Sequence, residues 1–253
     1  MTKMLALAAA AGMLFAASNA SAQAVKVTNV AFTPGSVTGT IHSSLYNGDA
    51  GIGQFEFKGN YVSNNAPFDI LTYCIDLGHS VSLGNVNYTS YSVIPIASYA
   101  GMTSAKINSL NALLTHTTSL LGAASGQNAI DISAATQMAV WEIMFETQSN
   151  WSVTNSSSAF YMTTPWGSSG SNSTALSNAE SLANTYLTNV KNSTWATNGA
   201  YDLKVLYSAN QQSQVFLTPS VPEPATWGMM VLGFGLVGGA LRTRRRANTL
   251  AAA

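Results

Sequence analysis

The chain has 253 residues, and ten basic residues balance ten acidic ones to give a formal net charge of zero. Four of the basic residues are Arg242, Arg244, Arg245 and Arg246 near the C-terminus, so residues 23–220 hold only five lysines against nine carboxylates. A nucleic-acid-binding face needs clustered Lys and Arg, and this sparse, slightly acidic charge excludes that class of function.

Residues 1–22 have the three parts of a secretion signal. Lys3 supplies the positive start, residues 5–17 supply an apolar stretch, and Ala20-Ser21-Ala22 supplies a small-residue cleavage site. The apolar stretch is shorter than a membrane-spanning helix requires. We therefore expect a cleaved signal peptide, with Gln23 as the first residue of the mature chain.

Residues 24–95 carry patterns typical of β-strands. Segments 25–32 and 52–58 alternate apolar with polar residues, as half-buried strands do. Segment 68–77 is a more continuous apolar run, and residues 88–96 again favour a strand. We expect the first half of the chain to form a sheet.

The pattern then changes to helical spacing. Residues 105–124 and 131–147 predict two helices, and the broad apolar face of the second predicts burial on more than one side. Residues 148–178 are rich in Ser, Asn, Thr and Gly and predict a long loop, and residues 175–190 predict a third helix.

Two late segments, 202–207 and 214–217, predict a closing β-hairpin that returns to pair with the first strands. The order of strands, helices and strands predicts an α+β domain over residues 23–219, in which a helical subdomain is inserted into a β-rich domain. We expect this domain to lie between the signal peptide and a C-terminal transmembrane helix.

Residues 220–253 form a tail with three parts. Pro222-Glu223-Pro224 comes first, and its prolines remove amide donors and hold the chain extended. Residues 225–241 carry no charge and are near the lower length limit for a membrane-spanning helix, which we predict there. The basic end, 242–246, should stay cytoplasmic while the protein body is translocated.

This order of parts resembles the PEP-CTERM sorting signal. The resemblance implies export through the secretion translocon, followed by processing at or near the Pro-Glu-Pro motif by an exosortase, a membrane transpeptidase. It also implies a Gram-negative bacterium that makes exopolysaccharide. The protein would lie in the inner membrane before processing, and in the outer membrane, cell surface or extracellular matrix afterwards.

Cys74 is the only cysteine, so no intramolecular disulfide can form. It lies in Thr72-Tyr73-Cys74-Ile75-Asp76, and two further segments are notable: Thr136-Gln137-Met138-Ala139-Val140-Trp141 and Ser213-Gln214-Val215-Phe216-Leu217. Together they resemble the thioester domains of bacterial surface adhesins, which carry an aromatic-Cys-apolar-polar motif, a Thr-Gln-x-x-apolar-Trp helix and a glutamine on a late strand.

The resemblance implies an internal thioester between Cys74 and Gln214, formed when the thiolate displaces ammonia from the glutamine amide. A lysine amine on a surface partner would then attack the thioester carbonyl. The residues that would shape the pocket are Tyr73, Thr136, Gln137 and Trp141. The residues flanking Gln214 depart from the family pattern, so Gln211 and Gln212 stay open as alternative glutamines.

Other interpretations remain open. Cys74 can be a buried apolar residue without chemistry. A second class is a polysaccharide-binding or structural matrix protein, with exopolysaccharide as its partner. Its stacking residues would be Trp151, Tyr161, Trp166 and Trp195. A third is a secreted cysteine hydrolase in which His79 or His116 activates the thiol.

The remaining titratable residues give weaker signals. His42, His79 and His116 do not have the spacing of a zinc site, so we expect neither a metal nor a cofactor. Glu142 and Glu146 lie four apart on one helix face, which predicts a solvated edge. The leading hypothesis is a non-enzymatic, surface-displayed adhesion or matrix protein.

Overall fold

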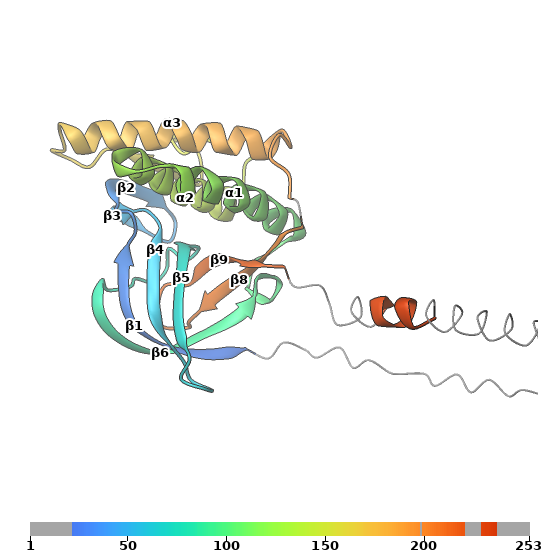
Figure 1. The fold of residues 1–253 in the computed structure, drawn as a ribbon. Helices are drawn as coiled ribbons and strands as arrows, with labels where there is room; N and C mark the ends of the chain where they lie inside the picture. The colour runs from blue at the N-terminus through green and yellow to red at the C-terminus, as the bar shows by residue number, and fades with distance from the viewer. Residues whose placement is uncertain (1–21, 198, 221–228, 237–253) are drawn as a thin grey trace, which may run out of the picture. The chain divides into compact units, whose positions relative to one another are not determined.

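A computed structural model describes residues 22–197, 199–220 and 229–236, and the described residues from 22 to 220 form one compact unit. This unit is a mixed α+β fold dominated by a closed six-stranded barrel, which confirms the predicted class (Figure 1). The barrel order is β1-β4-β5-β9-β8-β6, and every neighbouring pair is antiparallel. The barrel strands are β1 (Gln23–Phe32), β4 (Phe55–Tyr61), β5 (Pro67–Cys74), β6 (Gly84–Pro95), β8 (Tyr201–Tyr207) and β9 (Gln214–Pro219).

The late hairpin returns to the early strands, as predicted. Strand β9 pairs with β5 and β8 pairs with β6, so β8 and β9 close the barrel between two strands from the first half of the chain. The barrel interior is filled by alternating apolar side chains. Phe57 and Tyr91, for example, meet edge to face with ring centroids 5.8 Å apart.

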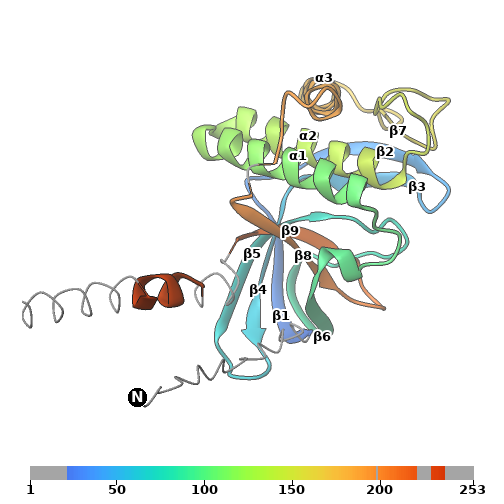
Figure 2. The ribbon, with the colours of Figure 1, turned by 90° about the vertical axis from the view of Figure 1, so that its right-hand side faces the viewer.

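Helices lie over one end of the barrel, as Figures 1 and 2 show. They are α1 (Ser104–Ala123), α2 (Gly126–Phe145) and α3 (Ser171–Lys191), with a short 3-10 turn, η1 (Ile96–Ser98), before them. Helix α2 packs against both α1 and α3 and reaches the end of β5. Nearly every residue from Asp131 to Met144 is buried, which confirms the expected burial on more than one side.

The predicted loop over 148–178 is wrong in part. It contains β7 (Phe160–Thr163) and the first two turns of α3. Strand β7 pairs with β2 (Val37–Ser43) in a separate sheet of order β3-β2-β7, where β3 is Asn47–Ile52. A four-residue strand within Ser- and Asn-rich surroundings is too short to show a period in the sequence. Helix α2 also begins five residues before its predicted start.

The C-terminal tail is described over residues 229–236 alone, which are helical and expose large apolar side chains such as Met229, Val231 and Phe234. Among the described residues, no helix combines the length and apolar character needed to cross a membrane. The predicted span 225–241 extends beyond these residues at both ends. Pro222-Glu223-Pro224, residues 242–246 and residues 1–21 lie outside the described part of the chain.

Candidate functional site

Cys74 and Gln214 face each other across the junction of β5 and β9. These strands pair over two positions, one of which is Cys74 with Gln214. The next residue, Ile75, donates its N–H to the carbonyl of Ser213 at 3.1 Å, so Cys74 and Gln214 form the adjacent non-hydrogen-bonded pair. Opposite side chains lie closest together in such a pair and share one face of the sheet. Both side chains are fully buried on this shared face.

Gln137 of α2 fixes the backbone of Cys74. Strand β4 pairs with β5 only from Phe55 opposite Thr72, so it supplies no ladder partner to Cys74. Gln137 takes that place: its Oε1 accepts the Cys74 N–H at 2.7 Å, and its Nε2 donates to the Cys74 carbonyl at 2.9 Å. The Gln137 side chain is fully buried. One amide thus satisfies both backbone groups of the cysteine.

Trp141, one helical turn beyond Gln137, lies beside the thiol. Its buried indole Nε1 has no hydrogen-bond partner of ordinary geometry among the described residues, but it lies close enough to Cys74 to favour the thiolate. Burial is the larger effect and raises the pKa of Cys74 to about 12, while the Trp141 and Asp76 N–H groups oppose the rise. The thiol is therefore protonated at neutral pH and contacts the Asp76 backbone, with Sγ 3.1 Å from its carbonyl oxygen.

The Gln214 carboxamide is held at both ends. Its Oε1 accepts a hydrogen bond from Thr72 Oγ1 at 3.3 Å, and its Nε2 donates to Gln212 Oε1 at 2.9 Å. Thr72 lies two residues before Cys74 and so projects from the same face of β5. Of the three glutamines left open by the sequence, Gln214 is the one opposite Cys74, while Gln212 orients its amide and Gln211 precedes the strand.

Tyr73 and Thr136 lie apart from the thiol. Tyr73 alternates with Cys74 along β5 and projects from the opposite face. Burial raises the pKa of Tyr73, and a hydrogen bond with the neighbouring Thr136 hydroxyl opposes this. Thr136 Oγ1 also donates to the Ile132 carbonyl of its own helix at 2.8 Å. Of the four predicted pocket residues, the structure brings Gln137 and Trp141 to the cysteine.

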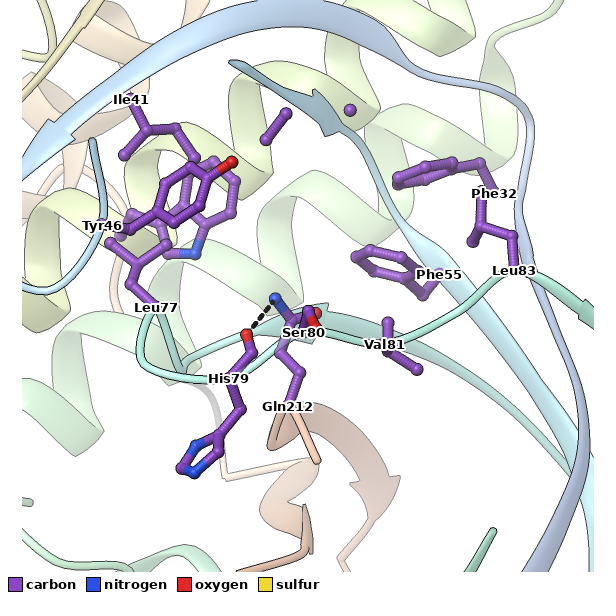
Figure 3. Close-up of a pocket in the computed structure, with 13 residues that line it drawn as sticks. Phe32, Ile41, Tyr46, Phe55, Leu77, His79, Ser80, Val81, Leu83 and Gln212 are labelled. Carbon is purple, nitrogen blue, oxygen red and sulfur yellow. Dashed lines mark hydrogen bonds between the residues drawn. The ribbon is translucent and has the colours of Figure 1, made fainter. Parts of the chain in front are cut away.

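A cavity of about 240 Å³ adjoins the Cys74–Gln214 pair. Its walls are mainly aromatic and aliphatic, and the lining includes Trp141 and Gln212, which contact Cys74 and Gln214 respectively. Figure 3 shows Gln212 reaching toward the backbone carbonyl of His79, to which its Nε2 donates at 3.4 Å, while the His79 ring points away from the other lining side chains. The cavity therefore reaches one neighbour of each paired residue, while Cys74 and Gln214 do not line it.

In the described part of the chain, neither the His79 ring nor the His116 ring makes a hydrogen bond with Cys74. His79 Nδ1 lies 2.8 Å from Asp76 Oδ2 at the surface. The His116 ring instead stacks on Trp195, with centroids 5.0 Å apart. Within residues 22–197 and 199–220, no group of His, Cys, Asp and Glu is arranged to hold a metal ion. The arrangement is unlike that of a cysteine hydrolase, which needs a base within reach of the thiol.

The aromatic residues predicted to stack on sugars are dispersed. Trp166 is fully exposed, at 102% of its reference area, and Tyr161 stacks on His42 with centroids 4.4 Å apart. Trp151 and Trp195 share one open cavity of about 390 Å³ beside α1 and the end of α3. The four side chains therefore do not form a single binding platform.

Glu142 and Glu146 are buried, so the predicted solvated edge is wrong. Glu142 Oε1 accepts the Ser152 N–H at 2.7 Å, and burial raises the pKa of Glu142 to about 7. Burial alone would also raise the pKa of Glu146, but four backbone amides lower it below its ordinary value. These amides belong to residues 147, 148, 159 and 160, so the two carboxyl groups fasten the 147–160 segment to α2.

We expect Glu142→Gln to remove a pH-dependent loss of stability. The unfolded chain ionises Glu142 near pH 4.5 and the folded chain near pH 7, so the unfolded state binds fewer protons between these values and stability falls as pH rises. The loss is on the order of 3 kcal/mol by pH 8. Urea unfolding at pH 5 and pH 8 measures the free energy of unfolding that is lost as pH rises. The Glu142→Gln variant should lose less of it than the original chain, by the amount due to Glu142.

Glu146→Gln, at the residue that caps the C-terminus of the same helix, is the matched control. Its carboxylate stabilises the folded state above its unfolded pKa, so this variant should be less stable than the original chain at pH 8. Equal pH dependence in the Glu142→Gln variant and the original chain would contradict the role given to Glu142.

Comparison with known proteins identifies the tail. Residues 220–246 match the PEP-CTERM protein-sorting motif, which confirms the predicted sorting signal. No curated protein and no solved structure matches the chain at a significant level, and the family match does not extend to the Cys74 segments. The motif marks the chain as an exported surface protein that an exosortase processes at the membrane of a Gram-negative bacterium.

Proposed function

We propose that this exported protein is a non-enzymatic adhesin or matrix protein that attaches covalently to a partner through an internal thioester between Cys74 and Gln214. The observation that supports this most strongly is the buried, non-hydrogen-bonded pairing of these residues across β5 and β9. Holding a nucleophile against its target in a fixed geometry makes the reaction effectively unimolecular.

The bond forms without an outside reagent. Cys74 Sγ bonds to Gln214 Cδ, the thiol proton passes to the departing Nε2, and ammonia leaves. The high pKa of Cys74 means that the proton must be transferred during the attack. Trp141 and Gln137 cover the pair, so water is kept from hydrolysing the product.

The thioester then reacts with an amine on the partner. The amine nitrogen enters through the cavity lined by Trp141 and Gln212 and bonds to Gln214 Cδ. The C–S bond breaks, and the proton from the amine returns to Cys74 Sγ. Each molecule reacts once, which suits a permanent attachment at a cell surface and does not constitute turnover.

A peptide with a single lysine tests this function. Incubation with the exported chain should give an adduct that survives denaturant, and peptide mapping should locate an amide between Gln214 and the lysine. A peptide with arginine in place of the lysine is the control, because a guanidinium stays protonated. Equal labelling by the two peptides, or a bond at another residue, would contradict the proposal.

A further inference from the structure

Thr72 is the side chain whose hydroxyl donates to the carbonyl oxygen of Gln214. The Oγ1–Oε1 distance is 3.3 Å, and both side chains are fully buried. Thr72 begins the sequence segment that contains Cys74 but precedes its aromatic-Cys-apolar-polar motif, and the sequence assigns it no role. Its position two residues before Cys74 places the hydroxyl and the thiol on the same face of β5.

We propose, on the basis of the thioester function above, that Thr72 is a catalytic residue that stabilises the negative charge developing on Gln214 Oε1. When Sγ bonds to Cδ, the carbonyl π electrons move onto Oε1. A hydrogen-bond donor fixed in place inside a buried site stabilises such an oxyanion far more than water does. The same oxyanion forms when a partner amine attacks, so Thr72 assists both steps.

Gln212 acts as the positioning residue for this reaction. Its Oε1 accepts from the Gln214 Nε2, so the amide is held with its oxygen toward Thr72 and its nitrogen toward Gln212. Gln212 in turn lines the cavity, and its Nε2 donates to the His79 carbonyl (Figure 3). The Tyr91 hydroxyl donates to the Gln212 carbonyl at 2.8 Å. The departing ammonia is therefore released on the cavity side.

Two other side-chain donors near the pair are engaged elsewhere. The Tyr91 hydroxyl is occupied by the Gln212 carbonyl, and Gln137 is occupied by the Cys74 backbone. Trp141 Nε1 lies beside the sulfur. In the described part of the chain, Thr72 supplies the hydrogen bond to the oxygen that gains charge.

The rate of thioester formation tests the role of Thr72. The full chain is synthesised in a short pulse in an exporting cell, samples are denatured at intervals with N-ethylmaleimide, and intact mass counts the chains with a free thiol. Because Cys74 is the only cysteine, alkylation reports on the bond directly. Thr72→Val should slow formation by about a hundredfold, as loss of an oxyanion donor does. Thr72→Ser should stay within a few-fold of the original rate.

Two further variants separate chemistry from folding. Thr72→Ala avoids crowding by a second methyl group, and thermal unfolding of each variant verifies its fold. Gln212→Met keeps the side-chain length but cannot accept from the Gln214 amide, and should slow formation less than Thr72→Val. If folded Thr72→Val and Thr72→Ala form the bond at the original rate, Thr72 is not catalytic although the thioester function stands. If the original chain keeps a fully alkylated thiol, both proposals fail.

Discussion

The exported chain is expected to take up one methylamine, and Cys74→Ala is expected to abolish that uptake completely. On the proposed mechanism, a small amine would enter through the cavity that Trp141 lines and open the thioester at Gln214 Cδ, which would leave a methylated amide and a free thiol. Without the sulfur, the Gln214 side chain remains an ordinary amide, which methylamine does not attack at neutral pH. Intact mass before and after incubation measures the uptake.

Matched variants identify the glutamine. Gln214→Glu should also abolish uptake, because a carboxylate offers no ammonia to displace. Gln211→Ala should retain uptake, since Gln211 precedes β9 and only Gln214 lies opposite Cys74. Uptake that persists in Gln214→Glu but disappears in Gln211→Ala would show that a different glutamine forms the bond.

Gln137→Leu is expected to lower the free energy of unfolding by about 3 kcal/mol, because it leaves two buried backbone groups without partners. Both the N–H and the carbonyl of Cys74 depend on the Gln137 amide, since β4 does not extend to this point of β5. Urea unfolding measures the loss. The variant should also form less thioester, because the backbone that carries the thiol is no longer fixed.

Gln127→Leu is the control for Gln137→Leu, because it makes the same substitution at another position of α2. Gln127 is exposed and bonds to Asp131 across one helical turn at 2.7 Å, so its replacement should cost less than about 1 kcal/mol. A loss of stability in Gln137→Leu no greater than in Gln127→Leu would refute the role of Gln137 as a substitute for the missing strand.

The sequence predicts the order of strands and helices, but it does not predict that the strands close into a barrel. The alternation in residues 52–58 predicts β4, and the helical spacing in residues 105–124 predicts α1. Both predictions succeed because each pattern is local in the sequence. Closure of the barrel depends on pairing between β5 and β9, whose paired residues Cys74 and Gln214 are 140 positions apart in the sequence. Such pairing leaves no periodic signal.

The site was predictable where a motif existed and not elsewhere. The motifs predict Cys74, Gln137, Trp141 and Gln214. In the structure Gln137 and Trp141 lie at Cys74, and Gln214 lies opposite Cys74 across β5 and β9. Thr72 had one available signal, its period-two spacing from Cys74, which is shared by many strand residues. The buried Glu142 was mistaken for a surface residue because its partner, the Ser152 N–H, belongs to a segment with no sequence pattern.

Intact mass of the exported chain under denaturing conditions tests the thioester most directly. The mass should fall short of that of the same processed amino-acid sequence by one ammonia, and the thiol should resist alkylation. A mass equal to the full sequence, together with a thiol that is alkylated in every molecule, would contradict the account.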